Sequence, residues 1–320
     1  MSGDEHKIWV LADDRAGNRA QSLGVAEALN RPYVIKEISY GPLAALPNAV
    51  MPPTFGGLSV AAKGELRPPW PELVITAGRR TAPVARRIKR MVQGQPRLLQ
   101  IMNPGGPLGD FDLVCIPSHD PSVNADNVIG IVGAPHGMTA DRLSAAREQW
   151  IGRLKDLTPP YIALVVGGTT RRRRFSDAMA LELAEMASAL ALAAGGSLLV
   201  TTSRRTGDVA ETLISNLRAP ARVYRWTDGG ENPYAGFLAC AETIIVTGES
   251  ISMCSEACAG QGPVYIYAPA ALITEKHRRF HQTLYDTGYA RALDGTYEHW
   301  QHERLNSADD IAQAIERIVS

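Results

Sequence analysis

The chain has 320 residues, 45% hydrophobic and 21% charged, and its 33 basic and 33 acidic residues give a formal net charge of zero. This length exceeds one typical core and predicts two domains. The balanced charge argues against a nucleic-acid partner, because bulk nucleic-acid binding needs a net basic surface. Acidic residues and a short apolar run open the chain, a pattern unlike a secretory signal, so we expect a cytoplasmic protein.

Short apolar runs alternate with helical patterns through the first half of the chain. Strands are predicted at residues 8–12, 33–38, 73–76, 98–102, 113–116 and 128–131, with helices at 20–29 and 82–91. Alternation of this kind predicts a parallel sheet covered by helices. Residues 41–71 are rich in Pro and Gly and predict a long loop or irregular helices.

A polar helix predicted at 138–157 ends at Thr158-Pro159-Pro160, and a second series of strands follows. These strands are predicted at 161–166, 197–202, 222–226, 243–247 and 264–267, with a helix at 177–194 and a closing amphipathic helix at 308–319. The expected division is a first domain at 1–140, a helical connector at 141–160, a second domain at 161–306 and a C-terminal helix at 307–320. The predicted fold is α/β, with two Rossmann-like domains whose parallel sheets face each other across a cleft. Ligands in such sheets sit beyond the carboxyl ends of the strands.

The most informative stretch runs from Val246 to Tyr267. Small and hydroxylated residues, among them Gly248, Ser250 and Ser252, lead from a strand into a helix predicted at 253–259. A helix start of this kind offers unpaired N–H groups to a phosphate. Glu256, one turn inside the helix, could accept hydrogen bonds from a sugar diol. The alternative is an ordinary capped β-α-β turn.

Three further loops of the second half carry candidate binding residues. Gly168 and Thr169 lie in a glycine-hydroxyl turn that could approach a phosphate, and the four arginines 171–174 follow it. These arginines form either a solvated basic turn or a contact with a diphosphate or an anionic lipid headgroup. Ser203-Arg204-Arg205 follows another strand, where arginine forks bind phosphate. Asn232 and Tyr234 lie in a Gly-rich stretch that is either a binding loop or a structural turn.

The first half offers candidates for acid–base chemistry. Asp13 and Asp14 follow the first strand, where they form either a general base or a solvated helix cap. His119 and Asp120 follow the strand at 113–116 and form either a base with its partner or an ordinary turn. Cys254 and Cys258 have no nearby histidine or further cysteine, so packing is expected for them rather than metal binding.

Several motifs carry a family resemblance over nearly the whole chain. They include DDRAGNRAQ (13–21), LVITAGRRTAPVARRIKR (73–90), FDLVCIPSHD (111–120), TTSRRT (201–206) and VTGESISMCSEACAGQGPV (246–264). The pattern resembles the mitochondrial-fission Elm-type family, classed with GT-B glycosyltransferases. The family is most similar to the enzyme that adds N-acetylglucosamine to the lipid-linked peptidoglycan precursor.

The resemblance implies a donor site in the second domain. Ser250, Ser252 and Met253 would lie at the diphosphate, and Glu256 would contact the ribose or the donor sugar. The residues expected to bind the nucleotide sugar are Gly168, Thr169, Ser203, Arg204, Arg205, Asn232, Tyr234, Glu249, Ser250, Ser252, Met253 and Glu256. The donor is expected to be a UDP-linked sugar, with no metal and no further cofactor.

One departure from the resemblance concerns the acid–base group. Relatives often carry Gly-His in the first loop, whereas this chain has Gly17-Asn18. Asn18 cannot act as a base, so Asp14, His119 and Asp120 are the predicted catalytic candidates.

Three functions are compatible with the sequence. The favoured one is transfer of a sugar to an acceptor hydroxyl of a glycan or lipid-linked molecule. The alternatives are a nucleotide-sugar 2-epimerase and a non-catalytic, membrane-associated interaction protein. The apolar segment 43–58 is expected to contact a membrane or a lipid-linked acceptor, which would place the protein on the inner face of the cytoplasmic membrane.

Overall fold

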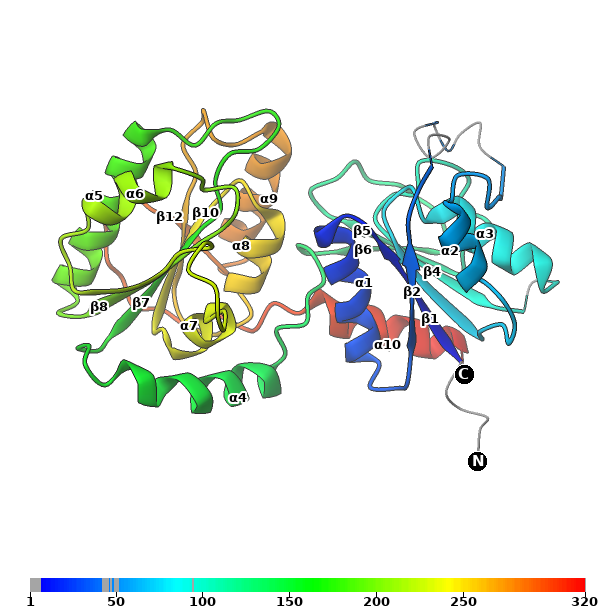
Figure 1. Cartoon of the computed structure of the whole chain (residues 1–320), viewed down its shortest axis with the longest axis horizontal. Coiled ribbons are helices and arrows are strands. Elements are labelled where there is room, and N and C mark those ends of the chain that lie inside the picture. Colours follow the sequence, from blue (N-terminus) through cyan, green and yellow to red (C-terminus); the bar gives the residue numbers. More distant parts are fainter. Residues whose placement is uncertain (1–6, 42–45, 47, 49–51, 94, 320) are drawn as a thin grey trace. The chain divides into compact units, whose positions relative to one another are not determined.

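The computed structural model describes residues 7–41, 46, 48, 52–93 and 95–319. Contacts between Cα atoms divide the chain into two compact units, Met1–Gly137 with Asn306–Ser320, and Met138–Leu305. Each unit contains one six-stranded parallel sheet flanked by helices (Figure 1). The α/β class predicted from the alternating pattern is therefore confirmed.

The first unit has the sheet order β2-β1-β3-β4-β5-β6. Its elements are β1 (Ile8–Asp13), α1 (Ala16–Ala28), β2 (Val34–Ile38), α2 (Val60–Glu65), β3 (Leu73–Ala77), α3 (Ala82–Met91), β4 (Arg97–Ile101), β5 (Leu113–Pro117), β6 (Val128–Ile131) and α10 (Ser307–Val319). Trp9 of β1 pairs in register with Val34 of β2 and Val74 of β3. The chain runs from β1 outward to β2 and returns to β3 on the other side of β1, which makes the β1/β3 border the topological switch point of this sheet.

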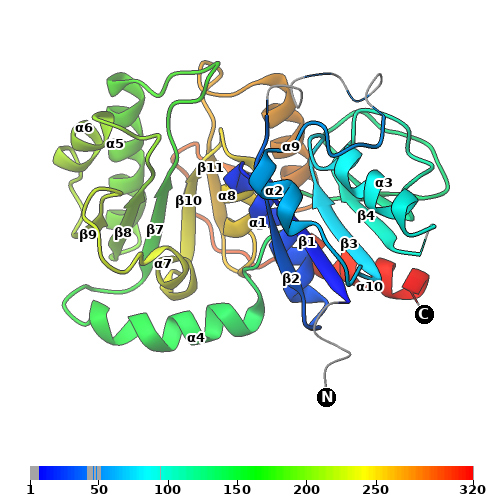
Figure 2. The same ribbon diagram turned by 45° about the vertical axis from the view of Figure 1, so that its right-hand side comes forward.

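Alternate residues of β1 point into two separate cores of this unit. Ile8 and Val10 pack with α1 and with Ile311 and Ile315 of α10. Trp9 and Leu11 pack on the opposite face with α2 and α3. Figure 1 shows α1 and α10 together, apart from α2 and α3, and Figure 2 shows β2, β1 and β3 side by side in the order of the sheet. The C-terminal helix therefore completes the core of the first unit although it follows the second in sequence.

The second unit has the sheet order β12-β11-β10-β7-β8-β9. Its elements are α4 (Ala140–Ile151), a 3-10 turn (Gly152–Leu154), β7 (Tyr161–Val166), α5 (Asp177–Ala193), β8 (Ser197–Thr202), α6 (Val209–Ser215), β9 (Ala221–Tyr224), α7 (Tyr234–Cys240), β10 (Thr243–Thr247), α8 (Ile251–Ala257), β11 (Val264–Tyr267), α9 (Glu275–Asp286) and β12 (Arg291–Ala292). Here the chain runs from β7 to β8 and β9, then returns to β10 on the other side of β7. The switch point is the β7/β10 border.

Two groups of helices cover the sheet of the second unit. Leu183 and Leu190 of α5 pack on Ile162 and Leu164 of β7. On the other face, Phe237 of α7 packs with the residues around the end of α4. The helix expected to connect two domains thus packs within the second unit (Figure 1).

Several elements differ from the expected ones. The helix expected at 253–259 begins at Ile251, because Ser250 caps it by accepting a hydrogen bond from the backbone N–H of Met253. Strand β9 ends at Tyr224, two residues before the expected end. Helix α9 was not predicted.

Part of the apolar segment 43–58 lies outside the described residues. Of its described part, Leu58 is buried and Phe55 packs against the core of the first unit. Leu58 therefore does not face solvent as the sequence had indicated, whereas Leu46, also in this segment, is 47% exposed.

Two absences hold for the described ranges. No helix there is both long and apolar enough to cross a membrane. Nor do three or more His, Cys, Asp or Glu side chains gather there in a way that could hold a metal ion. All four cysteines are buried and free, with Cys254 Sγ 3.8 Å from the carbonyl oxygen of Thr247.

Candidate functional site

The switch point of the second sheet brings two sequence-distant loops together. One loop, starting at Gly167, follows β7, and the other, starting at Gly248, follows β10; the two strands are neighbours in the sheet. The backbone N–H of Gly167 donates to Thr247 Oγ1 at 2.8 Å. Open α/β sheets bind ligands at such a border, so this is where the candidate site is built.

Glycine is required at both positions of the first loop. Gly168 has φ +137°, which side chains rarely adopt, and a Cβ there would collide with the backbone of Arg205. A Cβ on Gly167 would collide with the carboxylate of Glu249. The two glycines therefore allow the loops after β7, β8 and β10 to approach one another.

A buried ion pair links these three loops. Glu249 Oε1 accepts a hydrogen bond from the N–H of Gly168 at 2.7 Å and lies 3.2 Å from Arg205 Nη2. The Glu249 side chain is fully buried, whereas 35% of the Arg205 side chain is exposed. Burial raises the pKa of Glu249, and the Arg205 charge and the Gly168 N–H oppose this. Glu249 therefore links the loops after β7, β8 and β10. The exposed part of the Arg205 side chain could bind an anion.

The predicted residues of the β8 loop divide into structural and exposed ones. Ser203 Oγ donates to the carbonyl of Gly167 at 2.6 Å, and the N–H of Thr169 donates to the carbonyl of Arg205 at 2.9 Å. Arg204 is exposed and lines a cavity of about 210 Å³ at the ends of β8 and β9. Ser203 and Thr169 thus fix the loop, whereas Arg204 is available to a ligand.

Sequence reasoning missed one aromatic residue of that cavity. Trp226 lines it and is 53% exposed. Its backbone N–H donates to Thr202 Oγ1 at 3.0 Å, which fixes the start of the loop. The sequence had placed Trp226 inside a strand, but β9 ends at Tyr224, so the indole lies on a carboxyl-end loop. An exposed indole is a platform on which a nucleobase can stack.

The residues around α8 lie next to the ion pair. Ser250 caps the helix, Ser252 is half-buried, and Met253 Sδ lies 3.9 Å from Arg205 Nη2. The position of Met253 brings α8 against the exposed cation.

Glu256 has a protein partner of its own. The hydroxyl of Tyr234 donates to Glu256 Oε2 at 2.5 Å, and both side chains are half-buried. Burial raises the pKa of each, and the Glu256 charge adds to the rise for Tyr234. Asn232 is exposed and accepts a hydrogen bond from the N–H of Tyr234 at 3.0 Å. Asn232 and Tyr234 thus hold Glu256 in place.

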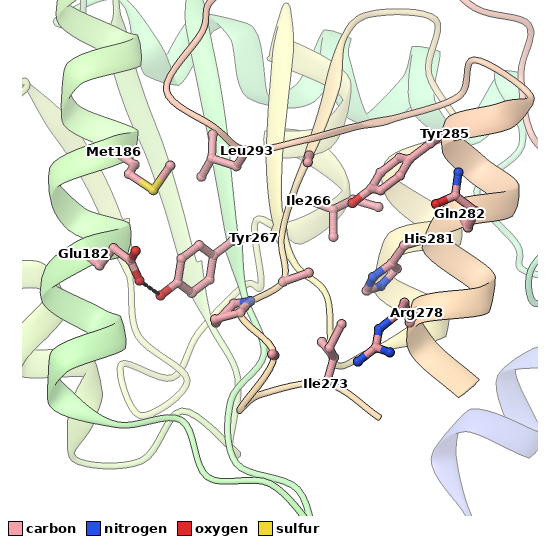
Figure 3. A pocket seen from close by; sticks show the side chains of 14 residues that line it. Glu182, Met186, Ile266, Tyr267, Ile273, Arg278, His281, Gln282, Tyr285 and Leu293 are labelled. Carbon is pink, nitrogen blue, oxygen red and sulfur yellow. Dashed lines mark hydrogen bonds between the residues drawn. The ribbon is translucent and has the colours of Figure 1, made fainter. Parts of the chain in front are cut away.

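A further cavity of about 400 Å³ lies beside this site, between α5 and α9 (Figure 3). Ile266, Ile273 and Leu293 form part of its apolar lining, and the Tyr267 hydroxyl donates to Glu182 Oε2 at 2.5 Å. His281 lines the cavity and, through Nε2, lies 2.8 Å from the carbonyl oxygen of Gly248. The pKa of His281 falls to about 4, mainly through burial, so its neutral ring donates to that carbonyl. The missed helix α9 therefore supports the loop after β10.

The switch point of the first sheet holds a different cluster. Asp13 is buried and accepts from Asn18 Nδ2 at 2.6 Å and from Arg80 Nη2 at 2.5 Å. Arg80 also bonds both carboxylate oxygens of Asp14, and its guanidinium lies 4.2 Å from the centroid of the Tyr40 ring. The hydrogen bond from Arg80 lowers the pKa of Asp14. Asn18, the residue that departs from the family pattern, orients the buried Asp13.

The other two predicted catalytic residues lie elsewhere on this sheet. His119 is buried and Asp120 is half-buried in the turn after β5. Strands β3 and β4 lie between β1 and β5 in the sheet. The structure therefore groups His119 with Asp120, but places Asp14 at another strand end.

The chain is similar in sequence to one protein family and to proteins of two organisms. The family described as mitochondrial fission ELM1 matches residues 16–319. An uncharacterized protein of Rickettsia prowazekii (strain Madrid E) is 30% identical over 353 residues, covering 96% of this chain and 97% of that protein. The mitochondrial fission protein ELM1 of Arabidopsis thaliana is 28% identical over 273 residues, covering 77% of this chain and 64% of that protein.

Among solved structures, the UDP-GlcNAc 2-epimerase of Methanocaldococcus jannaschii in complex with UDP-GlcNAc and UDP is similar in fold. The TM-score is 0.55 at 10% sequence identity, and the match covers 98% of this chain and 99% of that one. The predicted GT-B-like fold of two parallel-sheet units is confirmed.

Proposed function

The chain belongs to the mitochondrial fission ELM1 family, and from this we propose that it is a GT-B glycosyltransferase. Its second unit would bind a nucleotide-diphosphate sugar, UDP-linked, and the first would present an acceptor hydroxyl of a glycan or lipid-linked molecule. The observation that carries the proposal is the β7/β10 switch point. There a side-chain-free Gly167-Gly168 turn adjoins the partly exposed Arg205.

The proposed donor contacts follow from the chemistry of these loops. Arg204 and Arg205 would meet the diphosphate, since guanidinium groups bind phosphate oxygens in bidentate fashion. Trp226 would stack on the base. Glu256, already oriented by Tyr234, would accept hydrogen bonds from the ribose or donor sugar.

The proposed reaction needs a base and a stabilised leaving group. The acceptor oxygen attacks the anomeric carbon, its proton passes to a base of the first unit, and the bond from that carbon to the diphosphate oxygen breaks. Preorganised cations would stabilise the charge on the departing diphosphate. Asp14 is our first candidate for the base, with His119 and Asp120 as the others. We propose no metal and no further cofactor for this step.

Calorimetric titration with a panel of nucleotide sugars tests the donor site. We expect one UDP-sugar to bind, and Arg205→Gln to weaken it about tenfold or more, because one charge-assisted hydrogen bond is lost. Arg222→Gln is the matched control, since Arg222 lies on β9 and pairs with the exposed Asp156. If no nucleotide sugar binds the wild-type protein, the proposal fails and a non-catalytic role gains support.

A second measurement separates transfer from epimerisation. The protein is incubated with the bound UDP-sugar and no acceptor, and the sugar nucleotide is analysed for its isomer. A transferase leaves the sugar configuration unchanged, whereas an isomerised product would identify a 2-epimerase.

A further inference from the structure

Four consecutive arginines, Arg171 to Arg174, follow the Gly-Gly turn and are all exposed. Within the part of the chain that the structure describes, none of their side chains takes part in an ion pair or a hydrogen bond. Many other arginines do have acidic partners, as in the pairs of Arg153 with Glu231 and Arg225 with Glu211. In a chain with a net charge of zero, this run is a local concentration of charge that the protein does not neutralise.

The backbone of the arginine turn is fixed at both ends. The N–H of Thr170 donates to the carbonyl of Arg173 at 2.8 Å, and Thr170 Oγ1 accepts from the N–H of Arg173 at 3.1 Å. Phe175 is fully buried in the core, and its N–H donates to Thr169 Oγ1 at 3.1 Å. The four side chains therefore project from a structured turn.

The position of the turn carries an electrostatic cost. Helix α5 begins at Asp177 with Ser176 as its cap, so four cations lie beside the positive end of a helix dipole. The neighbouring loop after β8 adds charge, because Arg204 is exposed. The arginine turn is thus a local cluster of positive charge, and anions bound there would relieve the repulsion.

The arrangement of the arginines distinguishes between kinds of anion. A single small phosphate is held by donors that converge on it, whereas four solvent-exposed guanidinium groups on successive residues suit an array of separate charges. A leaflet of anionic phospholipids is such an array, and it attracts clusters of basic side chains. We propose that the turn of Arg171 to Arg174 is a contact site for an anionic phospholipid surface.

The proposal rests on the turn and not on nucleotide-sugar binding. Each arginine near an anionic leaflet strengthens partitioning roughly fivefold, so the four together contribute up to several hundredfold. The interaction should weaken as salt rises, because charges at a surface are screened within about 8 Å at physiological ionic strength.

Vesicle co-sedimentation with the full chain tests this surface. One set of vesicles contains phosphatidylcholine alone and the other contains phosphatidylglycerol as well. We expect the wild-type protein to bind only the second set, and the quadruple variant with Arg171, Arg172, Arg173 and Arg174 changed to Gln to lose about a hundredfold or more of its partitioning. The two double variants, at 171 with 172 and at 173 with 174, should each lose a part of it.

A matched control removes the same charge elsewhere. Arg67, Arg87, Arg218 and Arg304 are exposed and scattered, and changing all four to Gln should leave most of the binding intact. If both quadruple variants lose the same amount of vesicle binding, the effect is due to net charge alone and the proposal is wrong. The proposal is also wrong if the variant of the arginine turn binds vesicles as the wild type does. Thermal melting of each variant verifies that it is folded.

Two binding measurements with soluble ligands distinguish lipid binding by the arginine turn from nucleotide-sugar binding at the donor site. Inorganic pyrophosphate titrated without vesicles tests for a soluble phosphate ligand. If pyrophosphate binds at the turn and vesicles do not, the lipid proposal is wrong. If the turn variant loses UDP-sugar binding while vesicle binding persists, the arginines serve the nucleotide instead. A protein that binds vesicles but no nucleotide sugar would retain this surface and lose only the proposed transferase function.

Discussion

The switch points of the two sheets contain similar ion pairs, but the arginines of these pairs differ in how far they are exposed to solvent. Each has a buried carboxylate paired with an arginine from a neighbouring loop, Asp13 with Arg80 in the first unit and Glu249 with Arg205 in the second. Arg80 serves a second carboxylate, stacks on Tyr40 and is 14% exposed. Arg205 has one carboxylate and is 35% exposed.

The difference bears on the chemistry proposed for these two strand ends. In the first unit Arg80 bonds Asp13 and Asp14 through its terminal nitrogens, and the charge of Arg15 also lowers the pKa of Asp14. In the second unit Arg205 pairs with one carboxylate and stays partly exposed, whereas Gly167 and Gly168 are buried and their N–H groups already have partners. The exposed part of Arg205 supports the proposed binding of an anionic donor in the second unit, and the carboxylates of the first unit support the proposed base for an acceptor hydroxyl.

The largest effect is expected from removing Arg80. Arg80→Gln leaves Asp13 buried without its counter-ion, and we expect unfolding of the first unit to become easier by about 3 kcal/mol. Arg205→Gln should cost the second unit only about 1 to 2 kcal/mol, since the raised pKa of Glu249 lets that carboxyl take up a proton. Peptide-resolved hydrogen exchange in urea assigns each loss to its unit. Equal losses of unfolding free energy in the two variants would show that the two ion pairs do not differ in the way proposed.

The glycine turn is the next feature to test. Gly168→Ala adds a Cβ against the Arg205 backbone at a positive φ, and we expect a loss of about 2 to 3 kcal/mol together with loss of donor binding. Gly152→Ala is the control, because Gly152 has an ordinary helical φ and open space around its Cα. Thermal melting and titration with the UDP-sugar provide the two readouts. Donor binding that survives in Gly168→Ala would remove the turn from the site.

Acid should distinguish the two switch points. The folded protein lowers the pKa of His281 from 6.5 to about 4, so the unfolded chain takes up the proton first as the pH falls. The stability that this group contributes is therefore complete above pH 6.5 and is lost progressively toward pH 4.

The matching variant is His281→Gln, whose amide can still donate to the Gly248 carbonyl. We expect the wild-type second unit to lose about 2 kcal/mol more than the variant between pH 7 and pH 5. Asp14 of the first unit has a pKa lowered below 3.8 and adds no change in this window. Calorimetric melts at the two pH values measure the difference. A wild type and a variant with the same pH dependence would show that His281 does not support the loop after β10.

Much of the fold could be predicted from the sequence. The strands at 128–131, 161–166, 197–202 and 243–247 were predicted with the bounds observed, because continuous apolar runs flanked by turn residues are typical of buried parallel strands. Helix α9 escaped because its sequence is largely polar, and only Phe280, His281 and Leu284 are buried.

The arrangement of the site residues could not be predicted in the same way, because it depends on contacts between loops that are distant in sequence. Arg80 meets Asp13 across 67 positions in sequence, and no local pattern reveals such a pairing. Similarly, the sequence indicated Glu249 and Arg205 as ligand residues without indicating that they bind each other. Trp226 was predicted to lie in a strand, and the exposure of its side chain could not be predicted because it depends on where β9 ends.

The smallest change in stability is expected at Asp14, which also decides what the first switch point does. Asp14 is half exposed, and Arg80 keeps Asp13 when Asp14→Asn is made, so we expect stability to change by less than about 1 kcal/mol. If Asp14 is the base, the rate of sugar transfer falls about a hundredfold while donor affinity stays unchanged. Because its pKa is lowered, Asp14 is ionised throughout neutral pH, and the wild-type rate should not rise with pH there. Asp120→Asn and His119→Gln are the matched variants. A normal rate in Asp14→Asn with a loss in either of these would move the base to the end of β5 and leave the Asp13–Arg80 pair a purely structural role.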